Sequence, residues 1–328
     1  EMEWKILSLC VGVILLGGCA IYVEASRGDN SNEYRGCYHV CHFNNCSSSR
    51  EIEIFEASQS LTEKLFLWTC DDECKYYCMW RSAKIIMNRG EPVPQYFGKW
   101  PFVRLWGLQE PASVVFSIFN LLAHAANMIN FRKSVPSSAP LSQFWQIYGG
   151  VCINAWIWSI VFHARDTPWT EMMDYFCAFS MVLLSLFGLL IRMCGRERRR
   201  LKEILGVLCI GFFCYHIWYL TKRSFDYGYN MKVNIIVGVL NGFGWMVWAC
   251  TRWSSRRYVQ WCIYTMLWVG ASMMLELGDF PPLFWMFDAH ALWHFSTAVL
   301  PFFWYRFLIG DCLYLLEGKP IEDFKKQI

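Results

Sequence analysis

Two pairs of polar residues stand at helical spacing within apolar stretches of the sequence. Ser159 and His163 are four residues apart, and so are His290 and His294. Side chains at this spacing lie on one face of a helix, one turn apart. Asp174 follows the first pair closely in the chain. Because an ionisable group in an apolar span costs about 2.5 to 3.5 kcal/mol, each of these residues needs a functional reason.

These residue types match the chemistry of a catalytic zinc site. Such a site has three protein ligands and one open position, where the pKa of a water molecule falls to roughly 7. We therefore predict that His163, His290 and His294 bind zinc. Asp174 is expected to be the general base that takes a proton from the attacking water. Ser159 is expected to hydrogen-bond that water or the developing oxyanion, although a serine in a helix also commonly bonds to its own backbone.

Other polar residues fit this chemistry less well. His124 and His216 have no partner at helical spacing, so they are expected to pack between helices. Glu276, Asp279 and Asp288 are expected to lie in an ordinary solvated loop. The sequence contains no Gly-x-Ser-x-Gly turn, so it does not indicate a serine hydrolase.

The composition is that of a membrane protein. Of the 328 residues, 55% are hydrophobic and only 17% are charged, with a mean hydropathy of +0.24. Soluble domains are nearer a quarter charged. The apolar content excludes intrinsic disorder, and a formal charge of only +3 excludes a nucleic-acid-binding protein.

Seven stretches after residue 108 have roughly the 20 residues that a helix needs to cross the hydrocarbon core. They cover residues 112–131, 144–163, 172–192, 205–220, 233–250, 259–277 and 291–309. The predicted fold class is an all-α membrane protein, in which residues 109–310 form a seven-transmembrane catalytic helix bundle.

The charges of the short loops predict the orientation, because Lys and Arg collect on the cytosolic side. Eleven such residues lie in the first, third and fifth loops: Arg132, Lys133, Arg192, Arg196, Arg198, Arg199, Arg200, Lys202, Arg252, Arg256 and Arg257. Only four lie in the other three loops: Arg165, Lys222, Arg223 and Lys232. Residues before the first span are therefore predicted to be lumenal, and the C-terminus cytosolic. This orientation places Ser159 with His163, His290 with His294, and Asp174 at the same lumenal depth.

The N-terminal part carries export signals. Residues 1–25 combine Lys5, an apolar run and the small-residue pattern Val23-Glu24-Ala25, which predicts a secretory signal peptide; an uncleaved anchor helix is the alternative. Residues 26–108 form a predicted lumenal domain with six cysteines: Cys37, Cys41, Cys46, Cys70, Cys74 and Cys78. In an exported segment these predict disulfide bonds, with fifteen possible pairings. A zinc cluster is the weaker interpretation of their spacing.

The last residues, 311–328, are predicted to be a cytosolic tail. Lys325 and Lys326 stand four and three places from the carboxyl end, as in the dilysine retrieval signal of endoplasmic reticulum membrane proteins, although two lysines near a terminus are also common by chance.

The arrangement Ser159-x3-His163, Asp174 and His290-x3-His294 in a seven-span chain resembles the CREST superfamily of membrane hydrolases, which includes the alkaline ceramidases. Five further segments resemble the Per1-like family of GPI-anchor remodelling phospholipases A2. These are residues 97–102 (FGKWPF), 109–111 (QEP), 162–166 (FHARD), 275–280 (LELGDF) and 288–294 (DAHALWH). The six-cysteine domain also belongs to that pattern, so the resemblance covers nearly the whole chain after the signal.

The resemblance implies a zinc-dependent hydrolase of carboxylic esters that removes the sn-2 acyl chain of GPI anchors. Its partners would be GPI-anchored proteins and their lipid, and the dilysine tail favours the endoplasmic reticulum membrane over the Golgi. The resemblance carries zinc ligation to the three histidines and supporting roles to Ser159 and Asp174. It does not carry the calcium cluster of the ceramidases, because Glu110 alone stands where several acids would be needed. Alternatives are a ceramidase-type amide hydrolase and a non-catalytic lumenal chaperone or receptor.

Overall fold

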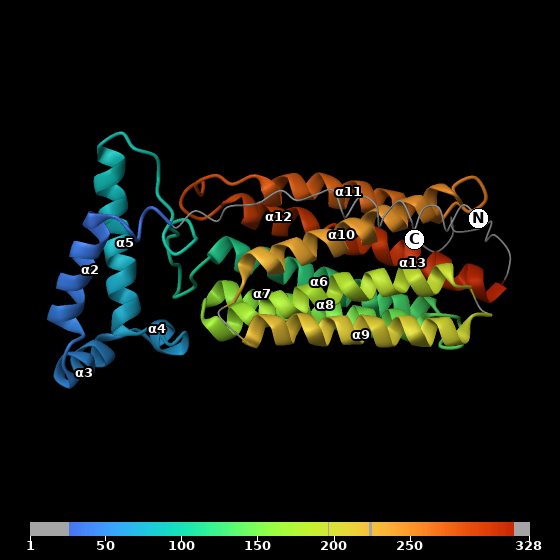
Figure 1. Cartoon of the computed structure of the whole chain (residues 1–328), viewed down its shortest axis with the longest axis horizontal. Helices are drawn as coiled ribbons and strands as arrows, with labels where there is room; N and C mark the ends of the chain where they lie inside the picture. Colours follow the sequence, from blue (N-terminus) through green and yellow to red (C-terminus); the bar gives the residue numbers. More distant parts are fainter. Residues whose placement is uncertain (1–25, 196, 223–224, 318–328) are drawn as a thin grey trace.

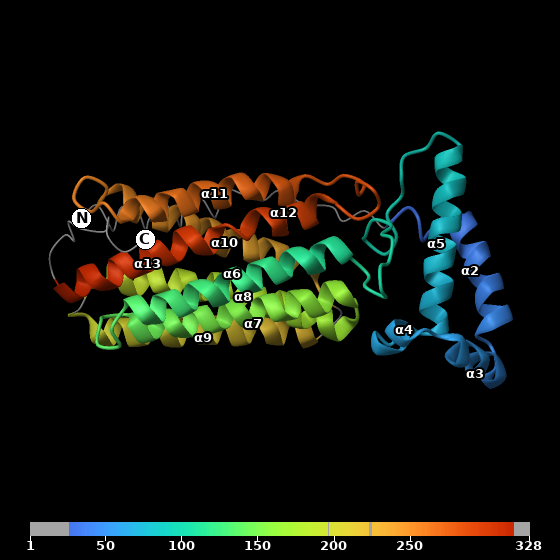
Figure 2. The ribbon, with the colours of Figure 1, turned by 180° about the vertical axis from the view of Figure 1, so that it is seen from behind.

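The described part of the chain is made of helices and loops. The computed structural model describes residues 26–195, 197–222 and 225–317; the expected signal peptide and the dilysine pair lie outside the described residues. Within the described ranges β-pairing is limited to three isolated bridges. Figures 1 and 2 show long helices side by side in one bundle, with the shorter helices α2 to α5 at one end of it.

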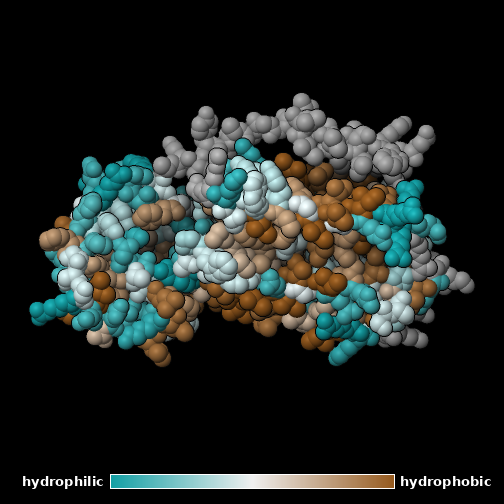
Figure 3. Space-filling view, turned by 60° about the horizontal axis from the view of Figure 1, so that its bottom comes forward, coloured by the Kyte–Doolittle hydropathy of each residue, from teal (hydrophilic) through white to brown (hydrophobic). Residues whose placement is uncertain are grey.

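Six helical stretches of the bundle are long and apolar enough to cross a membrane. They are α6 (Pro111–Ser134), α7 (Ser142–Ala164), α8 (Pro168–Met193), α9 (Arg199–Lys222), α10 (Tyr227–Cys250) and the broken helix α12 (Ala289–Thr297) plus α13 (Leu300–Glu317). The seventh predicted span is α11 (Val259–Leu277), which packs against α10, α12 and α13; it is not among these six and has Gln260 and Glu276 near its ends. The prediction of an all-α membrane protein is confirmed, and the bundle presents broad hydrophobic surface in Figure 3.

The six cysteines before the bundle form a ladder of disulfide bonds between two antiparallel helices, α2 (Asn32–Asn45) and α5 (Cys70–Asn88). The pairs are Cys37–Cys78, Cys41–Cys74 and Cys46–Cys70. Two smaller helices, α3 (Ser49–Ser58) and α4 (Leu61–Leu65), connect α2 with α5. The prediction of disulfides is confirmed, so these sulfurs are not metal ligands.

Helix α6 packs against α7, α12 and α13. One face of this apolar helix is polar along most of its length, and all of its members are buried. They are Ser113, Ser117, Asn120, His124 and Asn127. Small and polar residues on one face allow close approach and hydrogen bonds between membrane helices. This face contacts the part of the bundle that carries the histidines.

The last span, expected to be continuous over residues 291–309, is broken between α12 and α13. Pro301 has no N–H, so it cannot donate to the carbonyl of Thr297, and the helix cannot continue undisturbed. Backbone carbonyls freed in an apolar environment need other donors. The carbonyl of His294 accepts from Asn120 Nδ2 at 2.7 Å, and that of Ser296 accepts from Trp268 Nε1 at 2.8 Å. Neighbouring helices therefore stabilise the break.

A buried ion pair joins the helices at the end of the bundle opposite the disulfide region. The Arg192 guanidinium donates to both oxygens of Asp311, at 2.7 and 2.9 Å, and Tyr258 OH donates to the same carboxylate at 2.8 Å. Asp311 falls in the segment that was expected to be the cytosolic tail, but α13 continues to Glu317 and buries it. A bidentate pair of this kind fixes the relative position of α8 and α13.

The disulfide ladder makes a direct prediction. Protein alkylated without prior reduction and then digested should yield three cross-linked peptide pairs, joining Cys37 to Cys78, Cys41 to Cys74 and Cys46 to Cys70. Bundle cysteines such as Cys152 and Cys262, which are free and buried, should react with the alkylating reagent only after unfolding. Mass spectrometry checks both statements, and any other pairing would contradict the antiparallel arrangement of α2 and α5.

Candidate metal centre

Three histidines meet at the end of the bundle nearest the disulfide region. His163 is the second-last residue of α7, and His290 and His294 lie in the first turns of α12. His294 Nε2 is 3.2 Å from His163 Nε2 and 3.0 Å from His290 Nε2. One ring nitrogen from each histidine falls within 4.8 Å of the other two, so the group could hold a metal ion. The structure thus brings together all three predicted metal ligands.

Two carboxylates determine how two of these imidazoles are protonated. His163 Nδ1 is 2.7 Å from Glu110 Oε2, and His290 Nδ1 is 2.8 Å from Glu276 Oε2. A neutral imidazole donates from one nitrogen and accepts at the other. With Nδ1–H donated to a carboxylate, each Nε2 keeps its lone pair and directs it at the third imidazole. Carboxylate partners of this kind orient metal-binding histidines and raise their basicity.

Two of the separations between the imidazole nitrogens match those around a tetrahedral metal ion. Zn–N bonds of about 2.0 to 2.1 Å place neighbouring ligand nitrogens roughly 3.3 Å apart. The two Nε2 separations, 3.0 and 3.2 Å, are close to this value. The Nε2 lone pairs of His163 and His290 both face Nε2 of His294. A single N–H at that nitrogen could donate to only one of them, whereas a cation can be bound by the lone pairs of all three imidazoles. The chemistry of the donor set therefore favours a bound metal ion.

Lys99 supplies the counter-charge for the Glu110 carboxylate. Its ammonium is 2.7 Å from Glu110 Oε1 and 2.8 Å from Asp166 Oδ2, and it lies 4.3 Å from the centre of the Phe162 ring. Burial alone would raise the pKa of the Glu110 carboxyl, but the Lys99 ammonium and the His163 imidazole outweigh it and hold that pKa well below its usual range. Glu110 therefore stays ionised and accepts from His163.

Ser159 lies one helical turn before His163 on α7, as its spacing predicts, and is buried. Its hydroxyl is 3.1 Å from that of Ser117 on α6. Among the described residues it has no hydrogen bond to the three imidazoles. The site thus has a buried hydroxyl pair beside it, one member of which the sequence did not predict.

Asp174 lies near the start of α8 and is partly buried. Its carboxylate interacts electrostatically with His163 and His290, but in the described structure it forms no hydrogen bond with either. Asp174 is therefore close enough to the histidines to interact with their charge, but it does not hydrogen-bond to their ring nitrogens. This position suits a group that acts on a molecule bound between it and the metal site.

Several polar contacts of the site were not predicted from the sequence. Glu276, expected in a solvated loop, lies on α11 and pairs with His290. Asp288 caps the N-terminus of α12 by accepting from Ala291 N at 2.8 Å. Asp279 accepts from the Trp100 indole at 2.6 Å. All three acids expected to be ordinary loop residues therefore contribute to the structure around the site. His124 and His216 are buried between helices, as expected.

Comparison with known proteins gives the family. The model of the Per1-like family matches residues 60–312. A Xenopus laevis protein named GPI-specific phospholipase A2-like PGAP3 is 42% identical over 96% of this chain and 98% of its own. The human protein of the same name is 40% identical over 94% and 96% of the two chains. A Drosophila melanogaster protein, post-GPI attachment to proteins factor 3, is 39% identical over 91% and 93%.

No solved structure matches the chain. The family match includes every helix of the bundle up to Cys312 and all residues of the histidine centre. On this basis the chain belongs to the Per1-like family.

Proposed function

We propose that this protein is a zinc-dependent hydrolase that removes the sn-2 acyl chain from the GPI anchors of GPI-anchored proteins. The observation that carries the proposal is the convergence of three imidazole nitrogens, two of them held by carboxylates, at one end of a membrane bundle. The names of the similar proteins, GPI-specific phospholipase A2-like and post-GPI attachment factor, support the substrate class.

The depth of the site suits a lipid ester. A helix rises about 1.5 Å per residue, so His163, Asp174 and His294 lie within about 10 Å of the ends of their helices. The ester groups of a phospholipid lie just below the headgroups, at the edge of the roughly 30 Å hydrocarbon core. A lipid could therefore present its sn-2 carbonyl to the site while its acyl chains remain in the bilayer.

The residues of the chain have distinct roles in this proposal. His163, His290 and His294 hold the metal, while Glu110 and Glu276 keep the ligand nitrogens unprotonated. A zinc ion in this position supplies Lewis acidity, which activates water and polarises a carbonyl. Asp174 accepts the proton of the attacking water and returns it to the leaving glycerol oxygen as the ester C–O bond breaks. Ser159, shifted from Ser117, donates to the carbonyl oxygen as negative charge develops there.

The orientation and location are part of the same proposal. We place the disulfide-bonded region and the histidine centre in the lumen, because loop charges favour that orientation and disulfides form in oxidising compartments. The predicted division into signal peptide (1–25), cysteine-rich domain (26–108), catalytic bundle (109–310) and cytosolic tail (311–328) is compatible with this orientation, except that the bundle extends to the end of α13 at Glu317. The dilysine pair favours the endoplasmic reticulum, with the Golgi as the alternative.

Metal analysis tests the donor set. Purified protein should hold about one zinc ion per chain. His290→Ala should lose most of it. Glu110→Gln should bind zinc about 10- to 100-fold more weakly, because loss of a carboxylate partner lowers ligand basicity. Zinc content after dialysis against graded chelator gives these values, with His124→Ala as a buried-histidine control that keeps full occupancy. Full zinc content after loss of all three site histidines would disprove the assignment.

Replacement of the proposed base separates catalysis from metal binding. Asp174→Asn removes the proton acceptor but keeps the shape of the side chain. It should therefore retain zinc, while the rate of hydrolysis falls by about 10²- to 10⁴-fold. Both quantities can be measured on the same purified sample. If the variant loses zinc instead, Asp174 supports the metal and a different residue acts as the base.

Anchor composition tests the substrate. Cells without this protein should accumulate GPI-anchored proteins with an unremodelled, unsaturated sn-2 chain, and His294→Ala should fail to restore the saturated chain. Mass spectrometry of anchors released from a reporter protein measures this, with the His124→Ala protein as the rescuing control. Normal anchors in the deletion strain, or full rescue by His294→Ala, would refute the function. Accumulated ceramide with normal anchors would indicate the amide hydrolase, and bound zinc without either change would indicate a non-catalytic protein.

A further inference from the structure

The disulfide-bonded region exposes large apolar side chains beside the bundle. Leu61, Leu65 and Leu67 on and after α4, together with Trp106, have 71% to 84% of their surface exposed. Leu105, next to Trp106, is exposed as well. A soluble surface rarely carries such a group of large apolar residues without a partner. We call these five residues the α4 patch.

The residues of the patch come from two segments that pack against each other. The turn at 105–108 packs directly on α4: a Cβ added at Gly107 would lie 2.9 Å from the Phe66 ring and 3.2 Å from the Thr62 carbonyl. The Trp68 indole also donates to the Gly107 carbonyl at 2.9 Å. The turn and the helix therefore present their exposed leucines and tryptophan together.

The backbone at two points of the patch has an unfavourable conformation. Leu67 has a φ of 54° and Trp106 a φ of 50°, in the left-handed region that is costly for residues other than glycine. A turn with these angles ordinarily has Asn, Asp or Gly at such positions. Here the chain instead places large apolar side chains at the exposed points. Leu67 and Trp106 thus combine a costly backbone conformation with side chains that are largely unpacked within the described structure.

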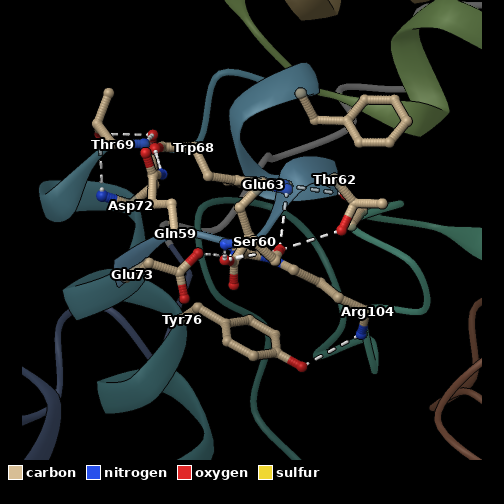
Figure 4. Close-up of polar contacts among 12 residues, drawn as sticks. Gln59, Ser60, Thr62, Glu63, Trp68, Thr69, Asp72, Glu73, Tyr76 and Arg104 are labelled. Atoms are coloured by element: carbon tan, nitrogen blue, oxygen red, sulfur yellow. Dashed lines mark hydrogen bonds and ion pairs between the residues drawn. The ribbon is translucent and has the colours of Figure 1, made fainter. Parts of the chain in front are cut away.

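Polar contacts join the residues after α4 to the end of α7. Figure 4 shows polar contacts around α4 itself, where Ser60 and Glu63 cap the helix. Arg165, which follows the last residue of α7, donates to the Phe66 carbonyl at 3.2 Å. Its guanidinium and that of Arg104 lie 3.9 and 3.3 Å from the Trp68 ring. These contacts hold α4 at the end of α7, level with the start of the membrane spans.

The patch is continuous with the membrane-facing surface. The turn at 105–108 leads within three residues into α6, and the exposed Trp169 stands at the start of α8 at the same end. In Figure 3 hydrophobic surface also appears at the edge of the disulfide region that adjoins the bundle. Lys64, between the leucines, is exposed and can extend its ammonium toward headgroups. Leu, Trp and Lys together are typical of segments that lie in a membrane interface.

We propose that the α4 patch is seated in the lipid headgroup and upper acyl region of the leaflet next to the histidine centre. The partner is thus the lipid surface itself, and the disulfide-bonded region rests on the membrane rather than extending freely from it. This inference is independent of the enzymatic proposal, because it depends only on the exposed side chains and their position at the ends of the spans.

Site-specific photocrosslinking tests the proposal on the full-length protein. A benzophenone amino acid is introduced at Leu65 or at Trp106, and the protein is placed in phosphatidylcholine nanodiscs that contain lipid with radiolabelled acyl chains. The matched control is the same amino acid at Phe43, which is 73% exposed but lies on α2, on the far side of α5 from the bundle. The disulfide pattern of each sample, determined by mass spectrometry, checks that the region is folded.

After illumination, the proteins labelled at 65 and 106 should carry radiolabelled lipid, and the protein labelled at 43 should carry only the background level. Equal labelling at all three positions, or none at 65 and 106 in correctly disulfide-bonded protein, would overturn the proposal. A cross-link to a second copy at 65 and 106, in place of lipid, would also overturn it and would identify the patch as a protein interface.

Discussion

The histidine centre depends on the location of two protons. An imidazole nitrogen can bind a cation only through a free lone pair, so the N–H of that ring must be on the other nitrogen. Glu110 and Glu276 impose this arrangement on His163 and His290. Neither carboxylate lies on the same helix as its histidine. Glu110 precedes α6 and pairs with His163 of α7, whereas Glu276 near the end of α11 pairs with His290 of α12. The centre can therefore form only when four separate elements meet at one end of the bundle.

The segment between α5 and α6 ties these elements together. Lys99 in this segment keeps Glu110 ionised by pairing with it and with Asp166, beyond the end of α7. Gln95 and Trp100 in the same segment both donate to Asp279, which follows α11 and its Glu276. A connection outside the spans thus holds both carboxylate-bearing elements near their histidines. Residues 97–102, which lie in the range matched by the Per1-like family model, thus have a structural role at the site.

The sequence predicted the parts of this structure that follow from local pattern. Apolar length located the helices, and spacing placed Ser159 with His163 and His290 with His294 on common faces. It could not show which acids reach the histidines, since Glu110 is 53 residues from His163 and the contact depends on how α6 and α7 pack. The sequence alone places Glu276 in a solvated loop, because an acid at the end of an apolar run is ordinarily solvated. In the structure Glu276 lies on α11 and pairs with His290.

The disulfide pairing was undetermined for a similar reason. Cys37 with Cys41 and Cys74 with Cys78 have the spacing of two helix faces, but only the antiparallel packing of α2 and α5 selects the partners. The polar residues of α6 recur at helical spacing, which is a local signal for a buried polar face. That face holds Ser117, which contacts Ser159, and Asn120, which contacts the His294 carbonyl.

The break in the last span determines what positions His290 and His294. In a continuous helix, the positions of His290 and His294 would follow from the position of α13. The Arg192–Asp311 pair holds α13 at the opposite end of the bundle. Because Pro301 interrupts the helix, α12 is instead held by contacts at its own end, from Asn120 and Trp268 to its last carbonyls and from Glu276 to His290. Contacts with α6 and α11 therefore position two of the three site histidines, although neither helix supplies a histidine of the centre.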